Sequence, residues 1–387
     1  MSHAPSDALS KRHDAIRKQL TGAALDGLVV TSLPNVLYLT NFTGSAAVAV
    51  VTVDRIWFAT DFRYVTAIQS SRGTPSACPG LELVTVEGSY DVALAGLLAS
   101  LPAVNIGFEA AHLTVSRHAW LLEALSRKSQ TVATEVSSLS RLVPTQGIVE
   151  RARVRKDDYE IATLREAGRR LSGVARGVLT EIRPGLPERQ LAAAIDRRIH
   201  DAGFDKTAFD TIVAGGPNAA LPHAHPGERK LTEGDLLVLD FGGVYDSYCV
   251  DLTRTVSIGP AGSRERAVYG AVLEAHDRAI QTVEPGRSRF DIDAVARNVL
   301  AGHGLAEAFG HGTGHGLGLE VHEDPRITRR RPDVDSGDEA VEPGMVFTIE
   351  PGAYLPEWGG VRIEDDVLVT ASGVEVLTDV PTELIEI

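Results

Sequence analysis

Glycine occupies every second position from Gly310 to Gly318, and this run constrains the fold more than any other feature of the chain. Repeated glycines break a helix, and their missing side chains let the main chain approach a ligand closely. Histidines stand within and just after the run, at positions 311, 315 and 322. We therefore interpret this segment as the wall of an active site rather than as part of a packed core.

Carboxylates follow or interrupt predicted strands on both sides of this run. Asp240 and Glu350 each come directly after a short aliphatic segment, which predicts a buried strand that ends at the carboxylate. Because Phe-Gly-Gly follows Asp240, we expect the chain to turn there. Asp251 lies in the middle of the predicted returning strand, where a charged residue is unusual.

A further carboxylate lies in a segment with strand periodicity, residues 360–369. The alternation places Val361 and Ile363 on one face and Arg362 and Glu364 on the other. Arg362 and Glu364 are therefore predicted to share the face that carries the functional groups.

These acids together predict a metal site, although each taken singly would be explained as a solvated turn residue. Four carboxylates beside one imidazole are too many anionic groups to bury together without cations. Oxygen-rich ligation with one histidine favours manganese or cobalt, and zinc also fits. Two bridging carboxylates and three further ligands suit two ions about 3.5–4 Å apart.

At this point the residues resemble the pita-bread metallopeptidases, the family of methionine aminopeptidases, aminopeptidase P and prolidase. The resemblance implies five metal ligands, which are Asp240, Asp251, His315, Glu350 and Glu364. It implies that Asp251 and Glu364 bridge two divalent metal ions, with Mn²⁺ expected first and Co²⁺ or Zn²⁺ as alternatives. The segment His311–Glu323 resembles the Xaa-Pro branch of the family rather than the methionine branch.

The resemblance also implies the fold class and the domains. We expect an α+β protein with a pita-bread catalytic domain at residues 150–387. Residues 1–145 resemble the family's smaller N-terminal domain, of the creatinase type, only in general form, and alternating predicted helices and strands make it α/β. The boundary is predicted near Leu142–Gly147.

Roles for the remaining site residues follow from the same resemblance. Glu350 would move protons as well as bind metal, His322 would donate to the developing oxyanion, and His223 would contact the substrate backbone on the leaving side. His311 would line the proline pocket. Arg362 would either orient Glu364 or bind a substrate carboxylate, and its sequence position leaves both roles open.

The expected activity is hydrolysis of Xaa-Pro peptide bonds, with a prolidase-like dipeptidase placed ahead of an aminopeptidase P that acts on longer peptides. Such bonds are tertiary amides whose proline ring fixes φ, so a dedicated site is needed. Two alternatives are a metal-free hydrolase of the creatinase kind and a non-catalytic binding protein. Both would be expected to lack members of the ligand set, and none is missing here.

Composition limits the partners. The chain has 387 residues, enough for two domains, and a formal net charge of −14, which argues against nucleic acid or an anionic membrane. Two cysteines are too few for a disulfide framework or a thiolate site. No apolar segment resembles a signal peptide or membrane span, so we expect a cytoplasmic protein. The expected partners are a proline-containing peptide substrate and a second copy of the chain, in a homodimer.

Overall fold

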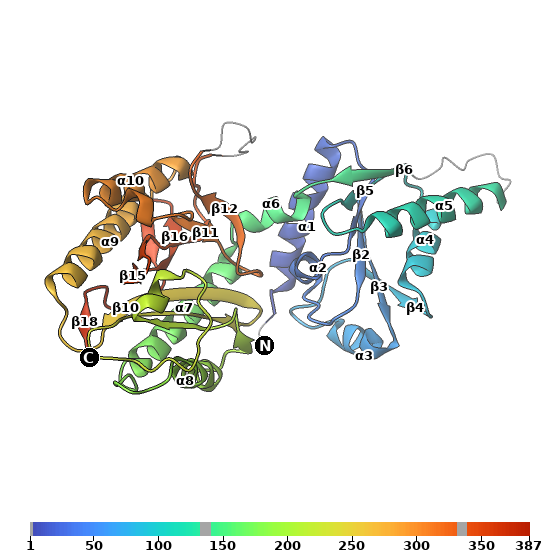
Figure 1. Ribbon diagram of the computed structural model, residues 1–387. Helices are drawn as coiled ribbons and strands as arrows, with labels where there is room; N and C mark the ends of the chain where they lie inside the picture. The colour runs from blue at the N-terminus through green and yellow to red at the C-terminus, as the bar shows by residue number, and fades with distance from the viewer. Residues whose placement is uncertain (1–2, 132–140, 331–338) are drawn as a thin grey trace. The chain divides into compact units, whose positions relative to one another are not determined.

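The computed structural model describes residues 3–131, 141–330 and 339–387. The chain divides into two compact units, Met1–Arg153 and Val154–Ile387, and each is described by itself (Figure 1).

The first unit contains a six-stranded mixed sheet in the order β4-β3-β2-β1-β5-β6. Strand β2 is buried at every position because helices cover both faces of the sheet, α4 and α5 on one and α1 and α2 on the other (Figure 1). The helices are α1 (Ser6–Gly22), α2 (Leu33–Thr40), α3 (Phe62–Ser71), α4 (Tyr90–Ser100), α5 (Val115–Thr131) and α6 (Ile148–Val154). The strands are β1 (Gly27–Val30), β2 (Val48–Thr52), β3 (Ile56–Asp61), β4 (Leu81–Val86), β5 (Asn105–Glu109) and β6 (Arg141–Thr145).

The second unit contains two helix pairs, and each pair packs against its own set of strands. Helix α7 begins at a capping box made by Asp157 and Glu160, and α10 begins at Ser288, whose hydroxyl accepts from Phe290 N. The first pair packs against β9 and β10, and the second packs against β13, β15 and β16. The helices are α7 (Asp158–Val178), α8 (Glu188–Asp201), α9 (Ser263–Thr282) and α10 (Arg289–Gly302), with short 3₁₀ turns η1 (Gly216–Ala220) and η2 (Ala306–Ala308). In the described parts of the chain, no helix is long and apolar enough to cross a membrane.

Three sheets lie between these helix pairs. The strand orders are β18-β10-β9-β7, with β8 also paired to β9, then β12-β11-β13-β16-β17, and β14-β15. The strands are β7 (Lys206–Thr207), β8 (Ile212–Gly215), β9 (Leu236–Tyr245), β10 (Tyr248–Ser257), β11 (Gly314–Gly316), β12 (Glu323–Ile327), β13 (Val346–Ile349), β14 (Gly352–Leu355), β15 (Gly359–Arg362), β16 (Asp365–Thr370), β17 (Gly373–Val376) and β18 (Ile385–Glu386).

The turn expected after Asp240 is wrong, because β9 continues to Tyr245 and Asp240 lies in its middle. Gly242 and Gly243 are needed for close packing instead. A Cβ atom on Gly242 would lie 2.4 Å from Val250 O, and one on Gly243 would lie 2.5 Å from the Phe204 ring. The chain turns only at Asp246 and Ser247, which both have positive φ.

The predicted strand over residues 360–369 is interrupted. Strand β15 ends at Arg362 and β16 begins at Asp365, and Glu364 between them forms an isolated bridge with Thr253 of β10. The interruption transfers the chain from β14-β15 to the neighbouring sheet. Ile363 still packs in the apolar core while Glu364 faces the site, as the alternation predicts.

Candidate metal centre

Three residues form the centre of the candidate site. Asp251 from β10, His315 from β11 and Glu364 after β15 present possible ligand atoms that all lie within 4.8 Å of one another. Their exposed fractions are only 5%, 8% and 2%. Three segments that are far apart in sequence therefore deliver ligands of the predicted types to one buried point.

Asp240 and Glu350 lie beside this cluster. Asp240 is the cross-strand partner of Thr253, whose hydroxyl contacts Glu364. Glu350 Oε1 lies 3.6 Å from His315 Nε2, and Glu350 N donates to Thr313 O. The structure thus brings all five predicted ligands together.

The carboxylates of the site are poorly matched to a cation-free interior. Burial raises the pKa of Asp251 and Glu364 well above the usual range, and neighbouring carboxylates raise it further. Burial also raises the pKa of Glu350 to about 7. Among the described residues, Asp240 Oδ1 and Asp251 Oδ1 have no hydrogen-bond partner. Buried acceptors without donors fit a site for hard divalent cations.

The histidines are suited to be neutral ligands or donors. Burial, followed by the nearby His322, lowers the pKa of His315 to about 3, so its imidazole is neutral at physiological pH. The ring of His322 lies 4.4 Å from that of His315, and His322 is on the exposed side. Burial likewise lowers the pKa of His311 to about 4. His311 Nε2 lies 2.8 Å from the Tyr354 hydroxyl.

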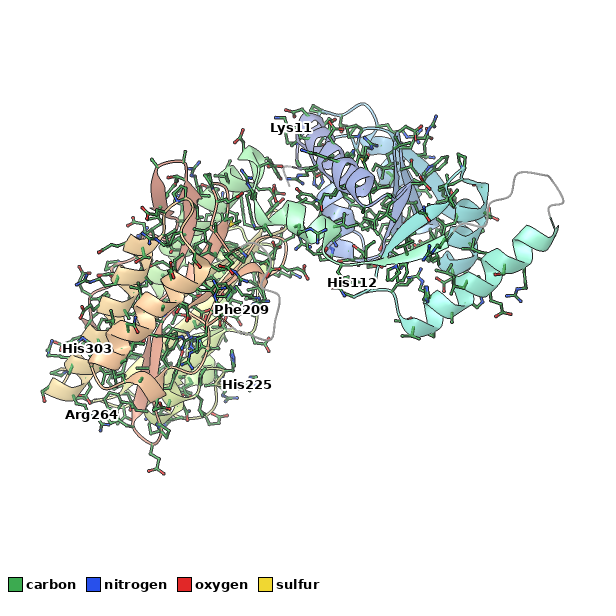
Figure 2. All side chains as sticks on the ribbon, turned by 90° about the horizontal axis from the view of Figure 1, so that it is seen from above. Lys11, His112, Phe209, His225, Arg264 and His303 are labelled. Carbon is green, nitrogen blue, oxygen red and sulfur yellow. The ribbon has the colours of Figure 1, made fainter. Side chains whose placement is uncertain are left out.

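His223 is exposed on the loop after η1. His223 is among the groups that lower the pKa of both His311 and His322, so it lies near these two histidines. His225, two residues later, is also exposed and lies at the surface of the unit (Figure 2).

Arg362 is 4% exposed, and its guanidinium is fully engaged in the site. It donates to Asp240 Oδ2 at 2.5 Å, to the Tyr354 hydroxyl at 2.9 Å and to Thr253 Oγ1 at 3.2 Å. Of the two roles left open by the sequence, this geometry favours orientation of a ligand, and the carboxylate it contacts is that of Asp240 rather than Glu364.

Two residues of the site were not predicted. Tyr354 bonds both Arg362 and His311, and burial raises the pKa of its hydroxyl to about 12. Arg326 is exposed and lies opposite His315 in the register of β11 and β12. Its charge contributes to lowering the pKa of His315 and His322, and it partly offsets the raised pKa of Glu350. Within the described residues, its guanidinium makes no hydrogen bond or ion pair. From sequence, only the alternation of side chains along β12 could have indicated Arg326. Its position opposite His315 depends on the pairing of β11 with β12, which includes a bulge.

A buried set of carboxylates and one neutral imidazole, with further histidines and arginines at its edge, defines a metallohydrolase site. Comparison of the sequence with models of known protein families identifies the class of hydrolase. Residues 162–371 match the model of metallopeptidase family M24, and residues 12–154 match the creatinase/prolidase N-terminal domain. The chain belongs to metallopeptidase family M24 and is a peptidase.

Individual relatives agree with this assignment. An uncharacterized peptidase of Bacillus subtilis, YqhT, is 36% identical over 96% of this chain and 99% of its own length. The structure of an Xaa-Pro dipeptidase from Bacillus anthracis superposes with a TM-score of 0.89 at 36% identity, covering 98% of this chain and all (100%) of that one. An X-Pro aminopeptidase from Thermotoga maritima gives 0.83 at 30% identity, covering 96% and 99%. The predicted fold class and the pita-bread resemblance are confirmed.

Proposed function

We propose that the protein is an Xaa-Pro dipeptidase that uses two divalent metal ions, with Mn²⁺ as the first candidate. The observation that carries this proposal is the convergence of four carboxylates and His315 in one buried cluster. The near full-length similarity to the Bacillus anthracis Xaa-Pro dipeptidase supports the choice of substrate.

Asp240, Asp251, His315, Glu350 and Glu364 would hold the two ions. Such ions supply an activated water and polarise the scissile carbonyl, which compensates for the low reactivity of a tertiary amide. Arg362 keeps Asp240 in position through a buried, charge-assisted hydrogen bond.

The surrounding side chains handle protons and orient the peptide. Glu350, whose Oε1 lies 3.6 Å from His315 Nε2, would accept and release a proton beside the metal ions as well as bind metal. His322 stands beside His315 on the exposed side, where it can donate a hydrogen bond to the substrate carbonyl oxygen. His311, held by Tyr354, would line the proline pocket, and exposed His223 would contact the substrate main chain.

Preference for dipeptides requires a group that binds the free carboxylate of proline. Arg326 supports this preference, because its guanidinium is exposed and close enough to influence His322 and Glu350. Arg362 is less suited to the task since its donors contact Asp240, Tyr354 and Thr253.

Aminopeptidase activity on longer peptides is the second candidate, favoured by the similarity to the Thermotoga maritima X-Pro aminopeptidase. Rates on Ala-Pro, Ala-Pro-amide and Ala-Pro-Ala with Mn²⁺ separate the two. A dipeptidase shows the highest kcat/KM on Ala-Pro. A kcat/KM for Ala-Pro-Ala that equals or exceeds that for Ala-Pro would assign the aminopeptidase activity instead.

Two broader predictions belong to this proposal. We expect a homodimer, which sedimentation velocity tests, and a cytoplasmic location, which cell fractionation tests.

A further inference from the structure

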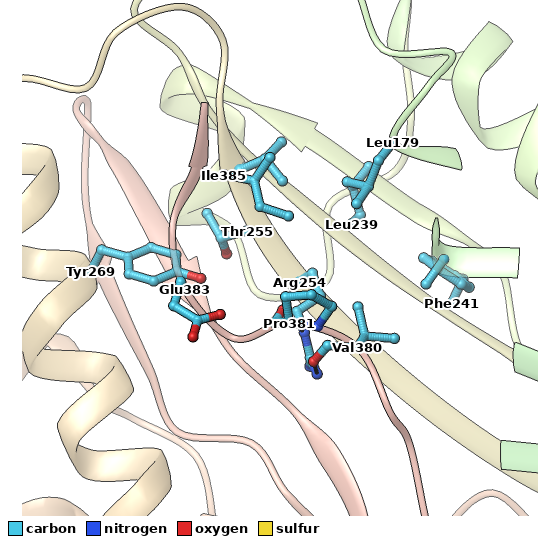
Figure 3. Close-up of a pocket in the computed structure, with 12 residues that line it drawn as sticks. Leu179, Leu239, Phe241, Arg254, Thr255, Tyr269, Val380, Pro381, Glu383 and Ile385 are labelled. Carbon is cyan, nitrogen blue, oxygen red and sulfur yellow. Dashed lines mark hydrogen bonds between the residues drawn. The ribbon is translucent and has the colours of Figure 1, made fainter. Parts of the chain in front are cut away.

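Strand β10 holds Glu364 at three points. Glu364 N donates to Thr253 O at 3.1 Å, and Arg254 Nη1 donates to Glu364 O at 2.6 Å, so both main-chain groups are fixed. Arg254 lies on the opposite face of the strand from the metal cluster, beside Val380 and Pro381 (Figure 3), and donates to both of their carbonyl oxygens. The only one of the three contacts that reaches the Glu364 carboxylate comes from Thr253, whose Oγ1 lies 2.6 Å from Glu364 Oε2.

The direction of this hydrogen bond is fixed by its surroundings. Arg362 Nε lies 3.2 Å from Thr253 Oγ1 and can only donate, so the hydroxyl oxygen is the acceptor in that contact. An ionised carboxylate, the form that binds a cation, can only accept. The hydroxyl hydrogen of Thr253 must therefore point to Glu364 Oε2.

We propose that Thr253 is a positioning residue whose hydroxyl, aligned by Arg362, holds the Glu364 carboxylate in its metal-binding orientation. The inference rests on the proposed metal centre but concerns a side chain that is not itself a ligand. Thr253 is 0% exposed, so water cannot replace its hydroxyl.

The carboxylates of the metal cluster repel one another, and this repulsion is a physical reason for placing a hydrogen-bond donor, Thr253, beside Glu364. Glu364 lies among Asp240, Asp251 and Glu350, and each of these carboxylates disfavours a nearby negative charge. Without a hydrogen-bond donor, the Glu364 side chain would lower its electrostatic energy by rotating away from these carboxylates. A hydrogen bond made before the cation arrives reduces the reorganisation that binding requires.

The chain offers a matched control two residues along the same strand face. Thr255 is 1% exposed, and its hydroxyl bonds only main-chain atoms, donating to Arg362 O at 2.9 Å and accepting from Arg362 N at 3.0 Å. Thr253→Val and Thr255→Val each remove one buried, bonded hydroxyl and keep the branched shape. Thr253→Ser keeps the hydroxyl and removes only a methyl group.

The test is a Mn²⁺ titration of the full chain by calorimetry, with circular dichroism to verify folding. We expect Thr253→Val to weaken Mn²⁺ binding roughly 10–100-fold, as is typical when a group supporting a ligand is lost. Thr253→Ser and Thr255→Val should stay within about 3-fold of the parent, because both leave the bond to Glu364 intact. The thermal stabilities of the two valine variants without metal should be similar.

Unchanged Mn²⁺ affinity in folded Thr253→Val would overturn the inference, as would equal weakening by Thr253→Ser, which would assign the effect to packing. If Thr253→Val does not fold, the comparison of Thr253→Ser with Thr253→Ala provides the same contrast. The binding measurement needs no turnover. Failure of the parent protein to cleave Ala-Pro would therefore count against the proposed function and leave the role of Thr253 standing.

Discussion

Replacement of Arg362 by alanine should destabilise the metal-free protein strongly. Arg362 is 4% exposed and neutralises a buried carboxylate, Asp240, at 2.5 Å. Removing one partner of a buried ion pair costs about 3–5 kcal/mol, because the other charge stays buried without compensation. The Tyr354 and Thr253 hydroxyls lose a donor as well, so we expect the loss in the free energy of unfolding to lie toward the upper end of that range.

Chemical denaturation with a chelator present, followed by circular dichroism, measures this loss. Arg362→Lys serves as the control, since a lysine keeps the positive charge but cannot make the forked contacts, and we expect it to recover part of the stability. In steady-state assays, Arg362→Ala should lower activity on Ala-Pro and Ala-Pro-amide by the same factor.

A loss below about 1 kcal/mol would refute the reasoning, because that is the range of a solvent-exposed pair. A KM increase confined to substrates with a free carboxylate would assign Arg362 to substrate binding instead.

Three further predictions concern the histidines, the substrate carboxylate and pH. His322→Ala should keep its Mn²⁺ and lose on the order of 10²-fold or more in kcat, as for loss of an oxyanion donor, whereas His315→Ala should lose metal; equal metal loss in both would contradict these roles. Arg326→Ala should raise KM for Ala-Pro about 10-fold, with little change for Ala-Pro-amide, and equal changes for both substrates would exclude Arg326 as the carboxylate group. Mn²⁺ affinity should rise between pH 6 and 8, because Glu350, with its pKa raised to about 7, and Asp251 and Glu364, with pKa values raised well above the usual range, must be ionised to bind a cation, while His315, with its pKa lowered to about 3, is already neutral; calorimetry in buffers of different ionisation enthalpy measures the released protons, and an affinity that falls with pH would contradict the assignment.

Local patterns were sufficient to predict much of the site. Alternation correctly placed Glu364 and Ile363 on opposite sides of their segment, with Ile363 in the core and Glu364 in the buried cluster, because the direction of a strand side chain depends only on its position. We interpret the glycine run as a place where the main chain comes close to a ligand, which the structure does not test, but glycines within it are needed for close packing between strands. A Cβ atom on Gly314 would lie 1.8 Å from Thr348 O, so only glycine fits next to His315.

Features that depend on distant partners could not be predicted in this way. Gly242 and Gly243 look like a turn in sequence but lie within a strand, because Val250 and Phe204 leave no room for side chains there. Tyr354 joins the site only because β14 pairs with β15 and brings it to Arg362. Such contacts are set by sheet pairing, which local sequence does not encode.

The most direct test of the account is hydrolysis of Ala-Pro as a function of bound Mn²⁺, in the parent protein and in Asp251→Asn. The account predicts no turnover by the chelated protein, recovery with about two ions per chain, and no recovery in Asp251→Asn despite an intact fold. Full turnover by the metal-free parent, or full activity of Asp251→Asn, would contradict it.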